Sequence, residues 1–72
     1  MEETKINKIL KLAKEKTMIS IATVHRDKNI GLSPHSAHIY LLEMEISGLL
    51  KRVEHKSAGR IFKFWRNADL EG

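Results

Sequence analysis

Four histidines of this 72-residue chain could in principle bind a metal ion: His25, His35, His38 and His55. His35 and His38 lie three positions apart, so a helix would place both imidazoles on neighbouring turns, where two metal ligands could converge. The chain has no cysteine, and this pair has no obvious carboxylate companion at ligand spacing. We therefore expect no metal site and no other cofactor.

Catalysis needs a context that these residue types do not have here. Serine, histidine and aspartate are all present, but the sequence contains no strand–turn–nucleophile segment and no glycine-rich phosphate loop. A domain of this length also has little room for an enclosed pocket. We expect a protein that is not an enzyme, and no residue is assigned as catalytic.

Basic residues give the stronger chemical signal. The formal net charge is +4, and between positions 50 and 66 a single acid, Glu54, stands against six basic residues. These are Lys51, Arg52, Lys56, Arg60, Lys63 and Arg66. A positive field concentrated in this way suits a polyanionic partner.

Length and composition bound the architecture and the location. With 72 residues, 42% of them apolar, the chain is expected to form one domain over residues 1–72, with a core near the lower limit for folding without disulfides or metals. No apolar run approaches the roughly 18 residues of a membrane span, and the N-terminal residues are acidic where a signal peptide would be basic. We expect a cytoplasmic protein with no membrane partner.

Two helices are expected in the first part of the chain. Over residues 4–16 the apolar side chains share one face and the lysines the other, which is typical of an amphipathic helix. The apolar face consists of Ile6, Ile9, Leu10 and Ala13, widened by Leu12. A short edge strand is expected at 17–19. Ser20 can then cap a second helix over about 21–28, although the β-branched residues of this segment also allow a strand over part of it.

The third expected helix carries the clearest boundary signals. Ser33 can accept a hydrogen bond from the first helical turn, and Pro34 follows at the position where a missing N–H costs nothing. Ala37, Leu41 and Met44 then recur along one face, and Gly48 offers a stop. We expect a helix over about 33–47.

After Gly48 the sequence predicts a β-hairpin. The runs 49–55 and 60–66 are rich in Val, Ile, Phe and Trp, and residues 56–59 supply the turn between them. Because side chains alternate along a strand, we expect Phe62 and Phe64 to cover the helices, and Lys63 with part of Trp65 to face solvent. Residues 67–72 show no pattern and are expected to fray.

Three features occur together at the third helix: Leu32-Ser33-Pro34 at its start, its apolar face, and Gly48-Leu49-Leu50-Lys51-Arg52-Val53 after it. In these features the chain resembles the winged helix-turn-helix domains of small archaeal, bacterial, plasmid or viral transcription regulators. The resemblance covers roughly residues 6–65. It implies an α+β fold with the order helix, strand, helix, helix and a two-stranded hairpin as the wing.

The resemblance also implies binding to double-stranded DNA and a role in transcription regulation. The third helix, about 33–47, would enter the major groove, and the basic hairpin, about 50–65, would contact the phosphate backbone. The base-contact candidates are His35, Ser36, His38 and Ile39. The backbone-contact candidates are Lys51, Arg52, Lys56, Arg60 and Lys63. None of the base-contact candidates is Arg, Asn or Gln, so modest sequence specificity is expected.

A second apolar stripe on the third helix leaves an alternative open. Ile39, Leu42 and Ile46 lie nearly opposite the core face, and we expect burial of at least one of them because so small a core needs the area. If the stripe is exposed instead, the chain could be a winged-helix module that binds a protein partner. We expect a monomer, or a weak homodimer through this stripe or the first helix.

Overall fold

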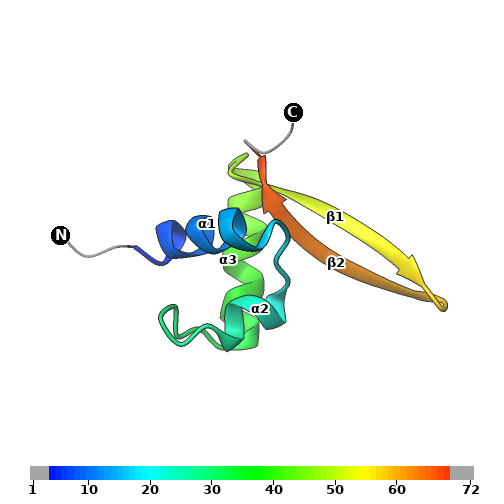
Figure 1. Cartoon of the computed structure of the whole chain (residues 1–72), viewed down its shortest axis with the longest axis horizontal. Coiled ribbons are helices and arrows are strands. Elements are labelled where there is room, and N and C mark those ends of the chain that lie inside the picture. The colour runs from blue at the N-terminus through cyan, green and yellow to red at the C-terminus, as the bar shows by residue number, and fades with distance from the viewer. Residues whose placement is uncertain (1–3, 69–72) are drawn as a thin grey trace.

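The computed structural model describes residues 4–68 and has an α+β architecture. Its elements are α1 (Lys5–Lys16), α2 (Ile21–Arg26), α3 (Pro34–Ile46), β1 (Leu50–Ser57) and β2 (Arg60–Asn67). The helices pack together, and the antiparallel hairpin of β1 and β2 projects away from them (Figure 1). None of the helices described is long and apolar enough to cross a membrane.

The expected strand at 17–19 is not formed. Only Ile19 pairs, in an isolated antiparallel bridge with Trp65, through backbone N–H···O bonds of 2.8 and 2.7 Å. The chain reaches this bridge through a sharp turn at Thr17, whose φ is 68°. Because the turn ends directly before the bridge and Ser20 already caps the next helix, one residue is left to pair with β2.

The predicted helix caps are confirmed. The Ser33 hydroxyl accepts from the Ser36 N–H at 3.2 Å, with Pro34 as the first helical residue. Ser20 and Thr23 form a reciprocal capping box at the start of α2. Such caps depend on side chains next to the helix, which explains why the local sequence predicts them.

Helix α2 ends two residues before the predicted end. Asp27 takes an extended conformation, and its carboxylate accepts the Asn29 N–H at 2.9 Å. Aspartate commonly satisfies a backbone donor two residues on in this way, which favours a turn over a further helical turn. Gly31 completes the connection with a φ of 65°.

The core lies between the three helices and the base of the hairpin. Its buried hydrophobic side chains are Ile9, Leu12, Ala13, Ile19, Val24, Ile30, Ala37, Leu41, Met44, Leu50 and Trp65. On α1 the predicted face is confirmed at Ile9, Leu12 and Ala13, which are buried, and at Leu10, which packs against the core. Ile6, predicted on the same face, is 39% exposed. On α3 the predicted core face of Ala37, Leu41 and Met44 is confirmed.

The hairpin is longer than predicted and its turn is tighter. The two strands pair from Leu50 with Asn67 to Ser57 with Arg60, leaving a two-residue loop of Ala58 and Gly59. Both loop residues have positive φ, 51° and 77°, as a type I′ turn requires. This turn matches the twist of the strands and lets them pair up to the loop.

The predicted fraying from residue 67 is wrong at its first two positions. Asn67 is 2% exposed and pairs in the ladder, and the Ala68 N–H donates to the Leu49 carbonyl at 3.3 Å. The remainder of that segment, 69–72, lies outside the described residues.

The predicted facing of β2 is also wrong. Trp65 is fully buried, whereas Phe62 is 43% exposed and Phe64 is half-buried. Since alternate side chains of a strand point to opposite faces, burying Trp65 turns Phe62 and Phe64 away from the helices. The Trp65 Nε1–H donates to Glu45 Oε1 at 3.0 Å, which joins β2 to α3.

Candidate functional site

One exposed surface runs along the outward face of α3. At about 100° per residue, His35, Ile39, Leu42 and Ile46 lie on the side of this helix opposite its core face. Ile39 is 42% exposed and Ile46 is 84% exposed. Leu42 is half-buried and packs against the core, so the expected burial within this stripe is met only in part.

The four base-contact candidates do not form one patch. His35 and Ile39 are exposed and lie side by side along the helix, whereas Ser36 and His38 are half-buried on its two flanks. The His38 ring meets the Trp65 ring edge-on, with centroids 6.3 Å apart. His38 therefore sits in the junction between α3 and the hairpin, and His35 with Ile39 is the accessible pair.

The backbone-contact candidates are all exposed, and the pleat divides the hairpin into two faces. The inner face, on the side of Trp65, carries Arg52, Glu54, Lys56, Ile61 and Lys63. The outer face carries Lys51, Val53, His55, Arg60, Phe62, Phe64 and Arg66. Both faces carry basic side chains, so the hairpin has a net positive charge on each face.

Arg52 lies near an acid of α3. Its Nε is 3.7 Å from Glu45 Oε2, and both side chains are partly exposed. A pair of this kind contributes little to stability but offsets part of the local positive charge. Lys63 is paired across the strands with Glu54, so the positive field is strongest beyond this pair, at Lys56 and Arg60 near the turn.

Helix α3 offers no positive charge of its own. Its 13 residues include Glu43 and Glu45 but neither lysine nor arginine. A polyanion approaching this side of the molecule is attracted by the hairpin and repelled by the C-terminal half of α3. The first turns of α3, around His35 and Ile39, are the part of this helix that it can approach most closely.

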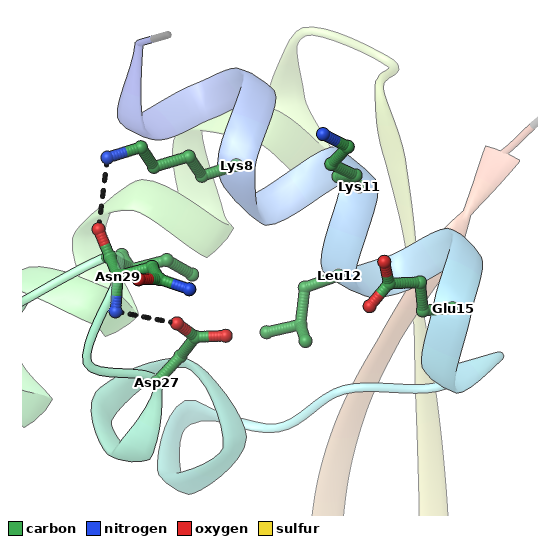
Figure 2. A pocket seen from close by; sticks show the side chains of 7 residues that line it. Lys8, Lys11, Leu12, Glu15, Asp27 and Asn29 are labelled. Atoms are coloured by element: carbon green, nitrogen blue, oxygen red, sulfur yellow. Dashed lines mark hydrogen bonds between the residues drawn. The ribbon is translucent and has the colours of Figure 1, made fainter.

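A hollow of about 350 Å³ lies elsewhere, between α1 and the turn after α2 (Figure 2). Two lysines of α1 hold the turn in place: Lys8 Nζ, from the lining of the hollow, donates to the Asn29 carbonyl at 3.0 Å, and Lys5 Nζ donates to the Ile30 carbonyl at 2.6 Å. Asp27 accepts from the Asn29 backbone, as Figure 2 also shows. These contacts fix α1 to the segment that leads into α3.

His25 contacts the turn between α2 and α3, a role that the sequence did not predict for it. Its Nδ1 lies 2.9 Å from the Leu32 carbonyl, one residue before the Ser33 cap. The hydrogen bond holds the turn between α2 and α3. No group of three possible metal ligands occurs among residues 4–68.

Sequence reasoning also missed the exposed apolar residues near the hairpin turn. Ile61 is 56% exposed on the inner face, and Phe62 is 43% exposed on the outer face. The signal is present in the run Ile61-Phe62-Lys63-Phe64-Trp65, which places apolar residues on both faces of a strand where only one face can cover the core.

In comparisons with protein-family models, curated proteins and solved structures, nothing matches this chain.

Proposed function

We propose that the chain is a winged helix-turn-helix domain that binds double-stranded DNA. The element order supports this fold: two helices joined by a short turn, α2 and α3, precede a projecting hairpin. The bridge between Ile19 and Trp65 also supports this fold. Ile19 pairs with β2 of the hairpin at the position where a winged helix has its first strand. In this proposal α3 is the recognition helix and the hairpin is the wing.

The observation that carries the DNA proposal is the placement of the charge. The hairpin projects from the core with six basic residues against one acid, and it is joined through Trp65 to the helix that presents His35 and Ile39. A helix fits the major groove, which is about 12 Å wide, and cations beside it can neutralise phosphates. The hairpin would supply affinity, and the first turns of α3 would supply contact with bases.

The side chains of α3 favour shape and apolar contact over strong base readout. An imidazole at His35 can hydrogen-bond a base edge or a phosphate, and the aliphatic Ile39 can contact a thymine methyl. Neither gives the bidentate pairing by which Arg, Asn or Gln distinguishes bases. We expect site preference to be modest, with phosphate contacts providing most of the binding energy.

A salt series tests the proposal. If the protein neutralises about four phosphates, log K should fall with log salt at a slope near −3.6. Fluorescence anisotropy with a labelled duplex, measured from about 50 mM salt upward, gives this slope. Absence of duplex binding at the lowest salt, or an affinity that salt leaves unchanged, would rule the proposal out.

A second candidate function is supported by one observation, the 84% exposure of Ile46 beside the 42% exposed Ile39. This apolar surface would suit a protein partner, including a second copy. Sedimentation across a concentration range, with Ile46→Glu as the variant, tests self-association. A dimer that the variant abolishes would support this function, whereas a monomer at every concentration would count against pairing of two copies.

A further inference from the structure

The outer face of the hairpin carries a row of rings that the core does not use. His55 and Phe62 are directly paired across the two strands, and Phe64, paired with Val53, follows on the same face. His55 is exposed, Phe62 is 43% exposed and Phe64 is half-buried. Because Trp65 points to the opposite face, these three rings point away from the helices.

Basic side chains lie at both ends of this row. Arg60 is on the same face at the turn, and Lys51 pairs with Arg66 on the same face near the base of the hairpin. Rings between cations are the arrangement that binds a single nucleic-acid strand, since bases stack on the rings and phosphates meet the cations. The positive charge of the whole hairpin also disfavours a second copy as the occupant.

The spacing of the rings favours unpaired bases over a duplex. Alternate residues of a strand are about 6.8 Å apart, so Phe62 and Phe64 are separated by about that distance along β2. Stacked bases of DNA follow one another every 3.4 Å or so, and inside a duplex their faces are already covered. Two successive bases can each stack on one of these rings only where the nucleic-acid strand is stretched and its bases are unpaired.

We propose that the outer face of the hairpin, with Phe62 at its centre, binds unpaired nucleic-acid bases by stacking. This inference rests on the proposed function, because both take the hairpin as a nucleic-acid-binding element. It adds single-stranded nucleic acid as a second class of ligand. The protein then binds a duplex through α3, the inner-face cations and Arg60 at the turn, and holds a single strand on the rings of the outer face.

The test compares Phe62→Leu with Ile61→Ala in the full chain, using anisotropy with a labelled mixed-sequence single strand and with a blunt duplex. Phe62→Leu keeps an apolar side chain but removes the ring, and it should weaken single-strand binding about fivefold or more. Duplex affinity should change less than about twofold. Ile61 is a neighbouring exposed residue on the inner face, so Ile61→Ala should change single-strand affinity by less than about twofold. Thermal melting of both variants checks that the fold is kept.

Four results would overturn the inference: no single-strand binding by the unmodified chain, equal single-strand affinity for the chain and Phe62→Leu, equal losses for the two variants, or a loss that also appears with the duplex. Binding to vesicles of anionic phospholipid, reduced by Ile61→Ala and without single-strand binding, would assign the exposed apolar residues to a lipid surface instead.

The two proposals fail separately. Duplex binding without single-strand binding would sink only the stacking inference. Single-strand binding that depends on Phe62, without duplex binding, would uphold the inference and reject the proposed function.

Discussion

The outward face of α3 and the hairpin are both exposed, but they differ in charge and in chemistry. The helix presents His35, Ile39 and Ile46, with two glutamates and no lysine or arginine in its 13 residues. The hairpin carries six basic residues and one acid, and only its base is buried. The hairpin can therefore attract a polyanion at a distance, whereas the helix can act only at short range.

The difference assigns separate roles to the two regions. Salt-dependent affinity is expected to reside in the hairpin, since phosphate neutralisation releases counterions. Any preference among sequences is expected to reside in α3. The junction of His38, Glu45 and Trp65 holds the two regions in a fixed relation, through a ring contact and the bond from Trp65 Nε1 to Glu45.

Breaking this junction should have the largest effect. Trp65→Ala removes a fully buried ring and leaves Glu45 Oε1 without its hydrogen-bond donor. A Trp→Ala change in a core costs about 3–5 kcal/mol, comparable with the whole stability of a small domain. Urea unfolding followed by circular dichroism should show a largely unfolded variant at room temperature.

Phe62→Ala is the matched control, because it shortens an aromatic residue of the same strand on the exposed face. It should cost less than about 1 kcal/mol, since little packing is lost. Equal destabilisation by the two substitutions would contradict the facing of β2 described above.

Neutralising the end of the hairpin should have the next largest effect. The variant replaces Lys56, Arg60 and Lys63 with Gln. Loss of three phosphate contacts should reduce the salt slope by about 2.7. Between about 50 and 200 mM salt, the unmodified chain should lose roughly 150-fold in duplex affinity and the variant only about 3.5-fold. Anisotropy titrations measure both.

A second triple variant removes the same charge outside the hairpin. It replaces Lys14, Lys16 and Lys28 with Gln. Its salt slope should stay close to that of the unmodified chain. If the two triple variants behave alike, only the net charge of the molecule matters, and the distinction between the hairpin and the rest fails.

Loosening the first turn of α3 should have a smaller effect. Ser33→Ala removes the cap that accepts the Ser36 N–H, at a cost of about 1 kcal/mol, or a melting temperature about 4–8 °C lower. Duplex affinity should weaken slightly with the salt slope unchanged, because no phosphate-binding cation is lost. Ser47→Ala at the other end of the helix is the control and should leave the melting temperature nearly unaffected.

The smallest expected effect is a gain in stability at the hairpin turn. Ala58 has a φ of 51°, a left-handed conformation that disfavours a residue with a Cβ. Ala58→Asn gives the Asn-Gly pair that type I′ turns prefer, and should add about 0.5–1 kcal/mol. The measurement is thermal melting, with the salt slope for duplex binding expected to stay the same. A lower melting temperature would show that the turn differs from the one described.

Most elements of the fold could be predicted because their signals are local. The Ser20 and Ser33 caps, and the three-residue core face of α3, depend on side chains within one or two helical turns. The hairpin followed from two apolar runs separated by a turn. The end of α2 at Arg26 was missed because the Asp27 side chain competes for the backbone, a contact that helical periodicity does not indicate.

The facing of β2 could not be predicted from its sequence. Ile61, Phe62, Phe64 and Trp65 are all apolar, so the strand lacks the alternation that identifies a buried face. The facing of β2 is determined by the burial of the Trp65 ring beside α3. The hydrogen bond that fixes this ring joins Trp65 to Glu45, 20 positions earlier in the chain. The site inherits the error, since Phe62 and His55 become exposed on a face that the pattern had assigned to the core.

Placement of the site residues was predictable only as far as helical geometry reaches. Ile39 was expected to be accessible and is 42% exposed. His38, three residues after His35, was expected to join it at a groove but lies against Trp65 instead. The surroundings of His38 depend on where β2 places Trp65, and the sequence of α3 alone does not contain that information.

The most direct test of the central claim is a map of backbone amide shifts during titration with a duplex. We predict shifts in two groups, residues 35–39 at the start of α3 and residues 51–63 along the hairpin, with little change around the hollow beside Lys8 and Asn29. Shifts confined to the hairpin would contradict insertion of α3. Shifts centred on Ile46, or none at any DNA concentration, would contradict DNA binding by this surface altogether.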